Sequence, residues 1–282
     1  MTAVVAVIAP GAMGAAVGKR LADRGAKVLT SLAGRSTASA ARARDAGMIA
    51  ASDGEIAAAD FILSILPPGE ALALAQHFAP VLAASNGKPV YVDCNAINPA
   101  TVERVAATIA PTGCSFVDCG IIGAPPKGDD AGPRFYASGE AATRFAGLRQ
   151  YGLDVRVLDG APSAASALKM SYAGITKGTQ AIGAAMILAA CRAGSADALL
   201  AELSYSQKEL LRQFRQQLPM MPGKAYRWVA EMREIAGFVA GDPAARELYD
   251  GAARFYERVA QDFSADQKDV AALKAFLDKG GS

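Results

Sequence analysis

Residues 4–14 constrain the fold of this chain more than any other segment. The run from Val4 to Ile8 has the composition of a buried strand, and a glycine-containing turn leads from it into an amphipathic helix. This order is typical of dinucleotide-binding folds, in which the free N–H groups at the start of the helix attract phosphates. Glycine at position 11 would let the backbone approach a pyrophosphate, and glycine at position 14 would let the helix pack closely on the strand.

The turn has the pattern Ala9-x-Gly11-x-x-Gly14, with alanine where glycine is usual, so it must tolerate a methyl group there. We expect a dinucleotide cofactor to bind along the whole turn, which consists of Ala9, Pro10, Gly11, Ala12, Met13 and Gly14. The alternative is a glycine-rich turn between a strand and a helix that binds no ligand.

The end of the second expected strand, residues 27–31, indicates the type of cofactor. An NAD enzyme normally has an acidic residue there that binds the ribose 2′-hydroxyl, and this chain has none. It has Arg35, Ser36 and Thr37 instead, and a planar guanidinium suits both stacking on adenine and pairing with a 2′-phosphate. This predicts NADP(H), bound by Arg35 and Ser36. Alternatively, Arg35 is a solvated loop charge and Ser36 or Thr37 only N-caps the next helix.

Strand-like and helical segments alternate through about residue 160, which predicts a Rossmann-type, doubly wound parallel sheet of the α/β class. After Pro162 only helical periodicity remains. We therefore expect an NADP-binding domain over residues 1–161 and an all-helical substrate and dimerisation domain over residues 162–282, with residues 162–192 as a long interdomain helix. The expected strands are 3–8, 27–31, 60–66, 89–93 and 114–118, with further edge strands at 135–137 and 155–158, and the expected helices are 12–25, 37–46, 70–84 and 99–109.

Composition and charge exclude several classes of function. A net charge of +2 is too small to indicate nucleic acid or a membrane surface as a partner. No apolar run approaches the roughly 20 residues that a membrane span requires, and no signal peptide is visible, so we expect a cytoplasmic protein. His77 is the single histidine and the four cysteines lack metal-ligand spacing, which argues against a metal site or a Ser-His-Asp triad.

Three segments rich in proline and glycine follow expected strands, at residues 66–69, 93–99 and 118–126. Ligands bind beyond the carboxyl ends of such strands, so these rigid turns together predict the wall of a cleft. Leu66 and Pro67 are expected beside the cofactor. Asn95 is expected to hydrogen-bond the substrate or the nicotinamide carboxamide. The alternative is that Asn95 is a plain turn residue that binds no ligand.

Taken together, these residues resemble the β-hydroxyacid dehydrogenase superfamily, which includes 3-hydroxyisobutyrate dehydrogenase and the cofactor domain of 6-phosphogluconate dehydrogenase. The glycine turn, the Gly34-Arg35-Ser36 loop and the Asp93-x-Asn95 segment followed by Pro99 are similar to motifs of that family. Lys169 stands where the family has its catalytic lysine. The likeness covers nearly the whole chain and looks closest to a branch whose helical carboxyl-terminal domain is of unknown function.

The sequence also departs from the family. Where members that act on small hydroxy acids have Ser-Gly-Gly to bind a carboxylate, this chain has Ile122, Gly123 and Ala124. One turn after the lysine, Tyr172 and Ala173 replace the usual asparagine. Glu231-Met232 stands where the family has a Lys-Asp pair. Together with an aromatic side chain from Tyr226 or Trp228, these differences indicate a more apolar substrate. We expect it to contact Ile122, Gly123, Ala124, Tyr172, Ala173 and Trp228.

Lys169 is the candidate general acid/base. Hydride transfer to a carbonyl leaves an alkoxide that must be protonated, and the reverse reaction needs a base. Burial beside a nicotinamide would lower the pKa of a lysine toward neutrality. The alternative is that Lys169 is a solvated helix lysine like Lys177.

Three functions remain open. The first is an NADP-dependent dehydrogenase or carbonyl reductase that uses Lys169; the second is an imine reductase with Tyr172 as proton donor; the third is a non-catalytic NADP-binding scaffold. A small-molecule substrate is expected as partner. The alanine-rich helical domain also predicts a homodimer, in which Trp228 reaches the cleft of the other subunit.

Overall fold

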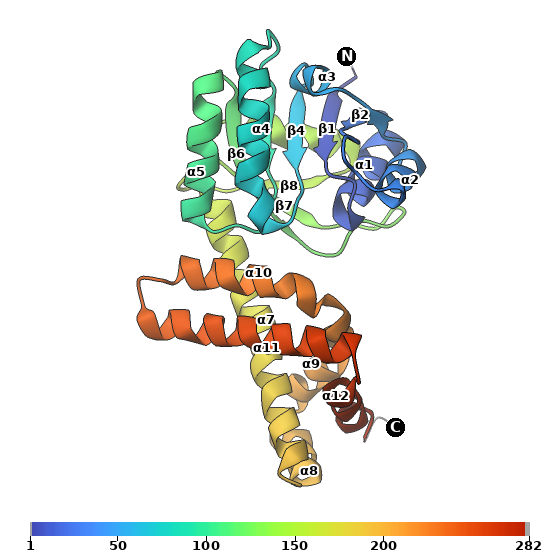
Figure 1. The fold of residues 1–282 in the computed structure, drawn as a ribbon, viewed down its shortest axis with the longest axis vertical. Coiled ribbons are helices and arrows are strands. Elements are labelled where there is room, and N and C mark those ends of the chain that lie inside the picture. Colours follow the sequence, from blue (N-terminus) through green and yellow to red (C-terminus); the bar gives the residue numbers. More distant parts are fainter. Residues whose placement is uncertain (1, 280–282) are drawn as a thin grey trace. The chain divides into compact units, whose positions relative to one another are not determined.

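The structure is a computed structural model that describes residues 2–279, and it divides into two compact units, Met1–Met170 and Ser171–Ser282. The first unit contains the sheet and the second is helical (Figure 1). Among the described residues, no helix combines the length and the apolar character needed to cross a membrane.

The first unit is built on one eight-stranded sheet in the order β3-β2-β1-β4-β5-β6-β7-β8. Every pairing is parallel except that of β6 with β7, which is antiparallel. The predicted Rossmann-type sheet is therefore confirmed. Its strands are β1 (Val4–Ile8), β2 (Lys27–Thr30), β3 (Ile49–Ala50), β4 (Phe61–Ser64), β5 (Val90–Asp93), β6 (Ser115–Ile122), β7 (Arg134–Ser138) and β8 (Asp154–Val157).

Helices cover both faces of the sheet, and each face has its own apolar core. Side chains alternate between the faces along a strand, so Val5 and Val7 face one core while Ala6 and Ile8 face the other. The helices of this unit are α1 (Ala12–Asp23), α2 (Thr37–Asp45), α3 (Asp53–Ala57), α4 (Ala71–Ala84), α5 (Pro99–Ile109) and α6 (Ala142–Phe145).

Two features of the first unit differ from the sequence-based expectation. The short elements β3, α3 and α6 were not predicted, although Ser52 and Glu55 form a capping box at the start of α3. Strand β6 runs on to Ile122, beyond the expected end at residue 118. The extra residues remain in strand conformation because antiparallel pairing with β7 satisfies their backbone groups, with Ile122 opposite Arg134.

The second unit is entirely helical, as predicted for the region after residue 162. Helix α7 (Ala164–Arg192) begins in the first unit and continues into the second. It is followed by α8 (Ala196–Ser206), α9 (Lys208–Gln217), α10 (Pro222–Phe238), α11 (Pro243–Ser264) and α12 (Lys268–Asp278). Helices α10 and α11 lie side by side (Figure 1).

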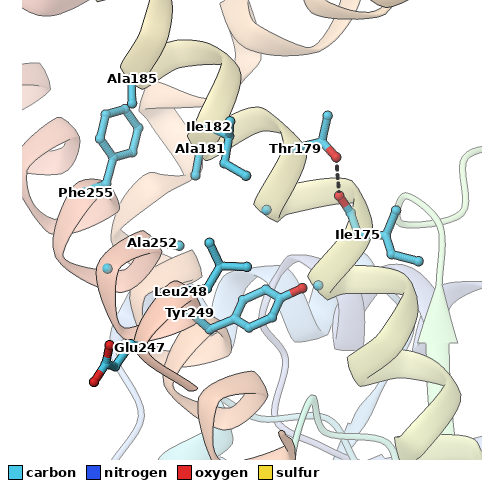
Figure 2. A pocket seen from close by; sticks show the side chains of 13 residues that line it. Ile175, Thr179, Ala181, Ile182, Ala185, Glu247, Leu248, Tyr249, Ala252 and Phe255 are labelled. Atoms are coloured by element: carbon cyan, nitrogen blue, oxygen red, sulfur yellow. Dashed lines mark hydrogen bonds between the residues drawn. The ribbon is translucent and has the colours of Figure 1, made fainter. Parts of the chain in front are cut away.

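A groove of about 470 Å³ lies between α7 and α11. Small residues of α7, such as Gly178 and Ala181, form its floor, and Leu248, Tyr249 and Phe255 of α11 form its wall (Figure 2). Tyr249 approaches α7 so closely that a Cβ atom at Gly174 would lie 2.8 Å from its hydroxyl oxygen. The glycines in this part of α7 therefore allow α11 to pack against it.

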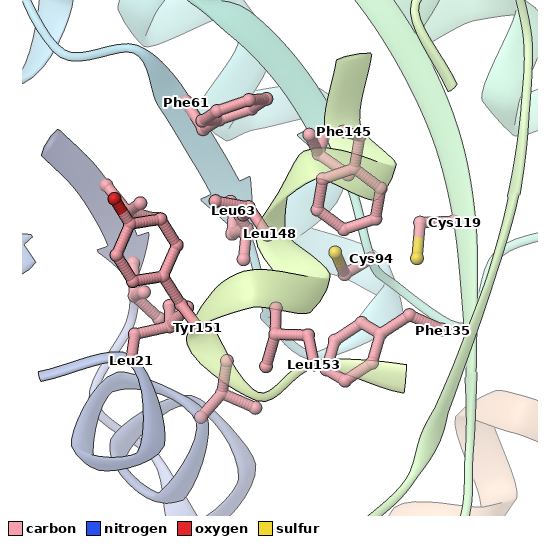
Figure 3. Close-up of a cluster of buried hydrophobic side chains, with 14 of the residues drawn as sticks. Leu21, Phe61, Leu63, Cys94, Cys119, Phe135, Phe145, Leu148, Tyr151 and Leu153 are labelled. Carbon is pink, nitrogen blue, oxygen red and sulfur yellow. The ribbon is translucent and has the colours of Figure 1, made fainter. Parts of the chain in front are cut away.

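The core on one face of the sheet contains Phe61, Phe145, Leu148 and Tyr151 together with side chains of α1 (Figure 3). Cys94 and Cys119 lie in the same core, where the end of β5 is next to the middle of β6. Cys114 is also buried and Cys191 is partly exposed, and all four thiols are free. His77 is a surface residue, 2.7 Å from a carboxylate oxygen of Asp53.

Candidate functional site

The turn at residues 9–14 joins β1 to α1 at the carboxyl edge of the sheet, and we call it the phosphate turn after the ligand that its sequence predicts. Gly11 is the N-cap of α1 in an extended conformation, and it has no side chain to accept the first N–H groups of the helix. A Cβ atom at Gly11 would meet no atom within 4 Å, so the space above it is open. A Cβ atom at Gly14 would instead overlap the carbonyl oxygen of Ala9. The turn thus has an open side at Gly11 and a tightly packed, strand-facing side at Gly14.

Ser36 and Arg35 lie in the loop after β2. Ser36 is the N-cap of α2, and its Oγ accepts a hydrogen bond from the Ser39 N–H at 3.3 Å. Arg35 is exposed at the tip of the loop, where its backbone N–H donates to the carbonyl of Leu32. The capping geometry at Ser36 is present, and the predicted contact of both residues with a 2′-phosphate stays a prediction.

Sequence reasoning missed a second arginine near the turn. The Arg42 Nε donates to the carbonyl oxygen of Pro10 at 3.1 Å, and its Nη2 donates to Ser39 Oγ at 2.9 Å. Arg42 therefore links α2 to the phosphate turn and adds a positive charge beside it. Its position seven residues after Arg35, in the last turn of the nine-residue helix α2, was the available signal.

The ends of β4 and β5 are joined by Asn95. Its Oδ1 accepts from the N–H of Leu66 at 2.5 Å, and its Nδ2 donates to Ser64 Oγ at 2.7 Å and to Asp93 Oδ2 at 3.1 Å. The side chain is buried and both of its N–H groups are engaged in fixing the strand ends. The predicted contact of Asn95 with substrate or nicotinamide stays a prediction, and in this arrangement only the second lone pair of Oδ1 is available for it.

Two buried carboxyls stand side by side in the sheet, Asp93 on β5 and Asp118 on β6. Burial raises the pKa of Asp93 to about 7, with a further contribution from the charge of Asp118 and an opposing one from hydrogen bonds to Asn95. Burial likewise raises the pKa of Asp118 to about 6, against hydrogen bonds from Ser166 and Ser138. The two carboxyls bind their protons more tightly in the folded chain than in the unfolded chain. The protonated carboxyls therefore contribute to the free energy of unfolding at low pH, and this contribution is lost as the pH rises through about 6 for Asp118 and about 7 for Asp93.

The carboxyl end of β6 carries the predicted substrate residues Ile122, Gly123 and Ala124. Ile122 is buried as the last residue of the strand, and Ala124 is exposed in the following loop. Gly123 has a φ of +135°, and a Cβ atom there would lie 2.9 Å from Cα of Pro133, so no other residue fits without strain. Their contact with a substrate stays a prediction.

Arg20 holds the loop after these residues against α1. Its guanidinium is buried and donates to the carbonyl oxygens of Gly128 and Asp130 and to a carboxylate oxygen of Asp130. The hydrogen bond from Arg20 lowers the pKa of Asp130. A loop anchored in this way presents Gly123 and Ala124 in a fixed place.

Lys169 lies in the first turns of α7, inside the first unit. Its Nζ donates to the carbonyl oxygen of Ile121 at 2.7 Å. Strands β1, β4, β5 and β6 are mutually parallel in direction, so their carboxyl ends share one edge of the sheet. The ammonium of Lys169 is therefore at the edge that also carries the phosphate turn, and it is half-buried rather than fully solvated.

The remaining predicted residues belong to the second unit. Tyr172 is 49% exposed and Ala173 is buried. Trp228 packs edge-on against the buried Tyr256, with ring centroids 5.2 Å apart. Their predicted contacts with a substrate stay predictions.

The prediction that Lys177 is a solvated lysine is wrong. Its side chain is 15% exposed, forms an ion pair with Glu231, and lies over the ring of Trp228 at 5.2 Å. The ammonium on α7 and the carboxylate on α10 thus form a pair that packs the helices of this unit together. Spacing along the chain gave no signal for it, because the two residues are 54 positions apart. Among the described residues, no group of three or more His, Cys, Asp or Glu side chains is arranged to hold a metal ion.

Comparison with protein families gives two matches. Residues 4–150 match the NAD binding domain of 6-phosphogluconate dehydrogenase. Residues 190–259 match a domain of unknown function, DUF1932.

The chain is also similar to individual proteins. An uncharacterized 28.5 kDa protein in the 7S RNA 5′ region of Methanothermus fervidus is 29% identical over 141 residues. That match covers 50% of this chain and only about half of the relative, 52% of its length.

Two solved structures resemble the chain over nearly their full lengths. One is a conserved protein of unknown function, described as structurally similar to 3-hydroxyacid dehydrogenases, with 30% identity, a TM-score of 0.72 and coverage of 93% of this chain and 98% of that one. The other is 3-hydroxyisobutyrate dehydrogenase from Mycobacterium tuberculosis, with 22% identity, a TM-score of 0.70 and coverage of 98% and 99%. The second likeness shows a shared fold.

Proposed function

Because the chain belongs to the family that has the NAD binding domain of 6-phosphogluconate dehydrogenase, we propose that it is an NADP(H)-dependent oxidoreductase. The proposed reaction is hydride transfer between the nicotinamide and a hydroxyl or carbonyl substrate, with Lys169 as general acid/base. The NAD(P)-binding, dehydrogenase-like fold is established by the match and by the sheet topology.

The phosphate turn fits a dinucleotide. Its open side at Gly11 offers backbone N–H groups at the start of a twelve-residue helix, where the helix dipole favours an anion. Its packed side at Gly14 accepts no side chain, because the carbonyl oxygen of Ala9 occupies that space. A turn with this shape would hold a pyrophosphate through main-chain donors alone.

Preference for NADP(H) is supported by the charges around the end of β2. The loop from Ser31 to Ser36 contains Arg35 and no acidic residue, and Arg42 adds a second guanidinium between α2 and the turn. A 2′-phosphate carries negative charge and a 2′-hydroxyl does not, so guanidinium groups favour the phosphorylated cofactor. Ser36 would add a hydroxyl and the N-terminus of α2.

The single observation that carries the catalytic proposal is the position of Lys169. A half-buried ammonium lies at the carboxyl edge of the sheet, hydrogen-bonded to the Ile121 carbonyl 2.7 Å away. When bound, NADP(H) supplies or accepts the hydride. Lys169 then gives a proton to the substrate oxygen during reduction and takes it from the hydroxyl during oxidation. Tyr172 lies one turn further along α7, on the same helix, and is proposed to contact the substrate.

The substrate is proposed to be more apolar than a small hydroxy acid. The end of β6 offers Ile122, Gly123 and Ala124, which have no side-chain donor for a carboxylate. Reduction of a C=N bond is the second candidate. It is supported by the exposed phenol of Tyr172, which is a proton donor on the same helix as Lys169.

A turnover panel tests the proposal. The full chain is assayed with NADPH and NADP+ against aldehydes, 3-hydroxy acids, polyol acids and cyclic imines, while cofactor binding is measured by calorimetry. We expect turnover of a carbonyl or hydroxyl compound. Turnover of imines alone would favour the second candidate, and tight NADPH binding without turnover of any class would favour a non-catalytic scaffold.

A further inference from the structure

The start of α7 is fastened to the sheet by a buried carboxylate. Asp118 on β6 accepts the N–H of Ser166 through Oδ2 at 2.8 Å and the hydroxyl of Ser166 through Oδ1 at 2.6 Å. Its register partner on β7, Ser138, accepts the N–H of Ala165 through Oγ at 3.0 Å. Two of the N–H groups that a helix leaves unpaired at its start are thus satisfied by side chains of the sheet.

Strand β6 and helix α7 also touch at Gly120, two residues after Asp118. A Cβ atom at Gly120 would lie 2.8 Å from the carbonyl oxygen of Ala165 and 3.1 Å from Cβ of Lys169, so α7 packs directly on the backbone of β6. Beyond that contact, Lys169 Nζ reaches the carbonyl oxygen of Ile121 at 2.7 Å. Strand β6 and helix α7 therefore contact each other at three places: at the hydrogen bonds between Asp118 and Ser166, at Gly120, and at the Lys169 ammonium.

This arrangement fixes where the ammonium lies. Ser166 and Lys169 are separated by less than one helical turn, so a displacement of the first turn of α7 also displaces Lys169. Placing a carboxyl at this buried position is costly, and burial raises its pKa. The free-energy cost of burying the Asp118 carboxyl is consistent with a need to hold the first turn of α7 in a defined position.

We propose that Asp118 is a positioning residue, which places the Lys169 ammonium for proton transfer by capping the first turn of α7 on β6. The inference rests on the proposed role of Lys169 as general acid/base. It assigns to Asp118 the function of holding the helix and not that of exchanging a proton with the substrate.

Two substitutions of Asp118 distinguish its role as a helix cap from a role of its negative charge. Asp118→Ala removes both acceptors, whereas Asp118→Asn keeps an oxygen for the Ser166 N–H and gains an N–H that can donate to the Ser166 hydroxyl. Asparagine caps helices about as well as aspartate. We therefore expect Asp118→Ala to lower kcat by about 10- to 100-fold, the range for misplaced catalytic groups, with NADPH affinity within a few fold, and Asp118→Asn to retain kcat within a few fold.

Gly120→Ala tests the same contact without changing a charge. The added methyl group would press on the backbone of α7, so we expect kcat to fall while NADPH affinity is kept. Val117→Ala is the matched control, because Val117 is a buried residue of β6 whose side chain lies in the core on one face of the sheet. It should lower the melting temperature and leave kcat nearly unchanged.

Hydrogen exchange of the backbone provides a readout that needs no substrate. Relative to the rest of each variant, exchange at residues 165–169 should accelerate in Asp118→Ala and Gly120→Ala and stay slow in Asp118→Asn and Val117→Ala. A poorly folded variant would instead exchange faster along its whole length. The proposal is overturned if Asp118→Ala keeps slow exchange and full kcat while Lys169→Ala loses activity, or if Asp118→Asn is as impaired as Asp118→Ala. Full activity of Lys169→Ala itself would instead overturn the proposed function.

Discussion

Arg35 is the residue on which the proposed cofactor preference depends most. It is exposed in a loop that contains no acidic side chain, beside the N-cap of α2. Replacement by alanine should weaken NADPH binding by about 1.5–3 kcal/mol, as for a hydrogen bond to a charged group, and leave NADH binding almost unchanged. Calorimetric titration of both cofactors measures this difference.

Arg44→Ala is the matched control for Arg35→Ala. Arg44 is an exposed arginine in the last turn of α2, so its loss changes the net charge equally and leaves the loop intact. It should affect both cofactors weakly. An equal loss of NADPH and NADH affinity in Arg35→Ala would refute a contact with the 2′-phosphate.

At the residue scale, sequence reasoning identified polar groups but not their partners. The Asp93-x-Asn95 segment indicated a turn after a strand, and Asn95 does lie there. That its amide donates to Ser64 follows only from the pairing of β4 with β5, which brings together residues 31 positions apart. Lys177 and Glu231 likewise became a pair through helix packing that no local spacing indicates.

The turn between β1 and α1 is an element whose two glycines have separable functions. Gly11 has a φ of −72°, which alanine adopts readily, and open space around its Cβ position. Gly11→Ala should therefore fold with an unchanged melting temperature and bind both NADPH and NADH at least about tenfold more weakly, because the methyl group occupies the space of the phosphates.

Gly14→Ala should behave differently. Its methyl group would overlap the carbonyl oxygen of Ala9, so α1 must move away from β1 and the melting temperature should fall. Thermal unfolding and calorimetry of both variants check the pair. A Gly11→Ala variant with normal cofactor affinity would contradict the assignment of the turn as the phosphate site.

At the element scale, long periodic segments were predictable and short ones were not. The main strands and helices and their order followed from apolar periodicity, because each buries a face against the sheet. The two-residue strand β3 and the five-residue helix α3 are too short to show a period. The extension of β6 to Ile122 depends on pairing with β7, a contact that the local sequence does not encode.

For the whole molecule, we propose a homodimer. Ile175, Ile182 and Met186 are 69%, 53% and 57% exposed on α7, and their spacing of seven and four residues places them on one face beside the groove in Figure 2. An apolar stripe of this kind is suited to cover by a second copy of the chain. Light scattering at micromolar concentration should give twice the monomer mass of 28.9 kDa.

Ile182→Asp should shift the equilibrium toward the monomer by placing a charge in the interface. Tyr205→Asp, at an 83% exposed position on α8, is the control and should leave the mass unchanged. A wild-type mass near 28.9 kDa would rule out the dimer. The stripe itself was not identified from the sequence, because the alanine-rich composition of α7 does not show which apolar residues the neighbouring helices cover.

In the proposed NADP(H)-dependent reaction, Lys169 transfers the proton. The most direct test compares kcat, its pH profile and NADPH affinity for the wild type, Lys169→Ala and Lys169→Arg, with a substrate found in the turnover panel. Lys169→Ala should lower kcat by about 10²–10⁴-fold, the usual contribution of positioned proton transfer, and lose one limb of the pH profile, with NADPH affinity within a few fold. Lys169→Arg should not restore activity, because a guanidinium keeps its proton at any working pH. Near-wild-type kcat in both variants would show that Lys169 does not transfer the proton and would assign this step to Tyr172 or to water.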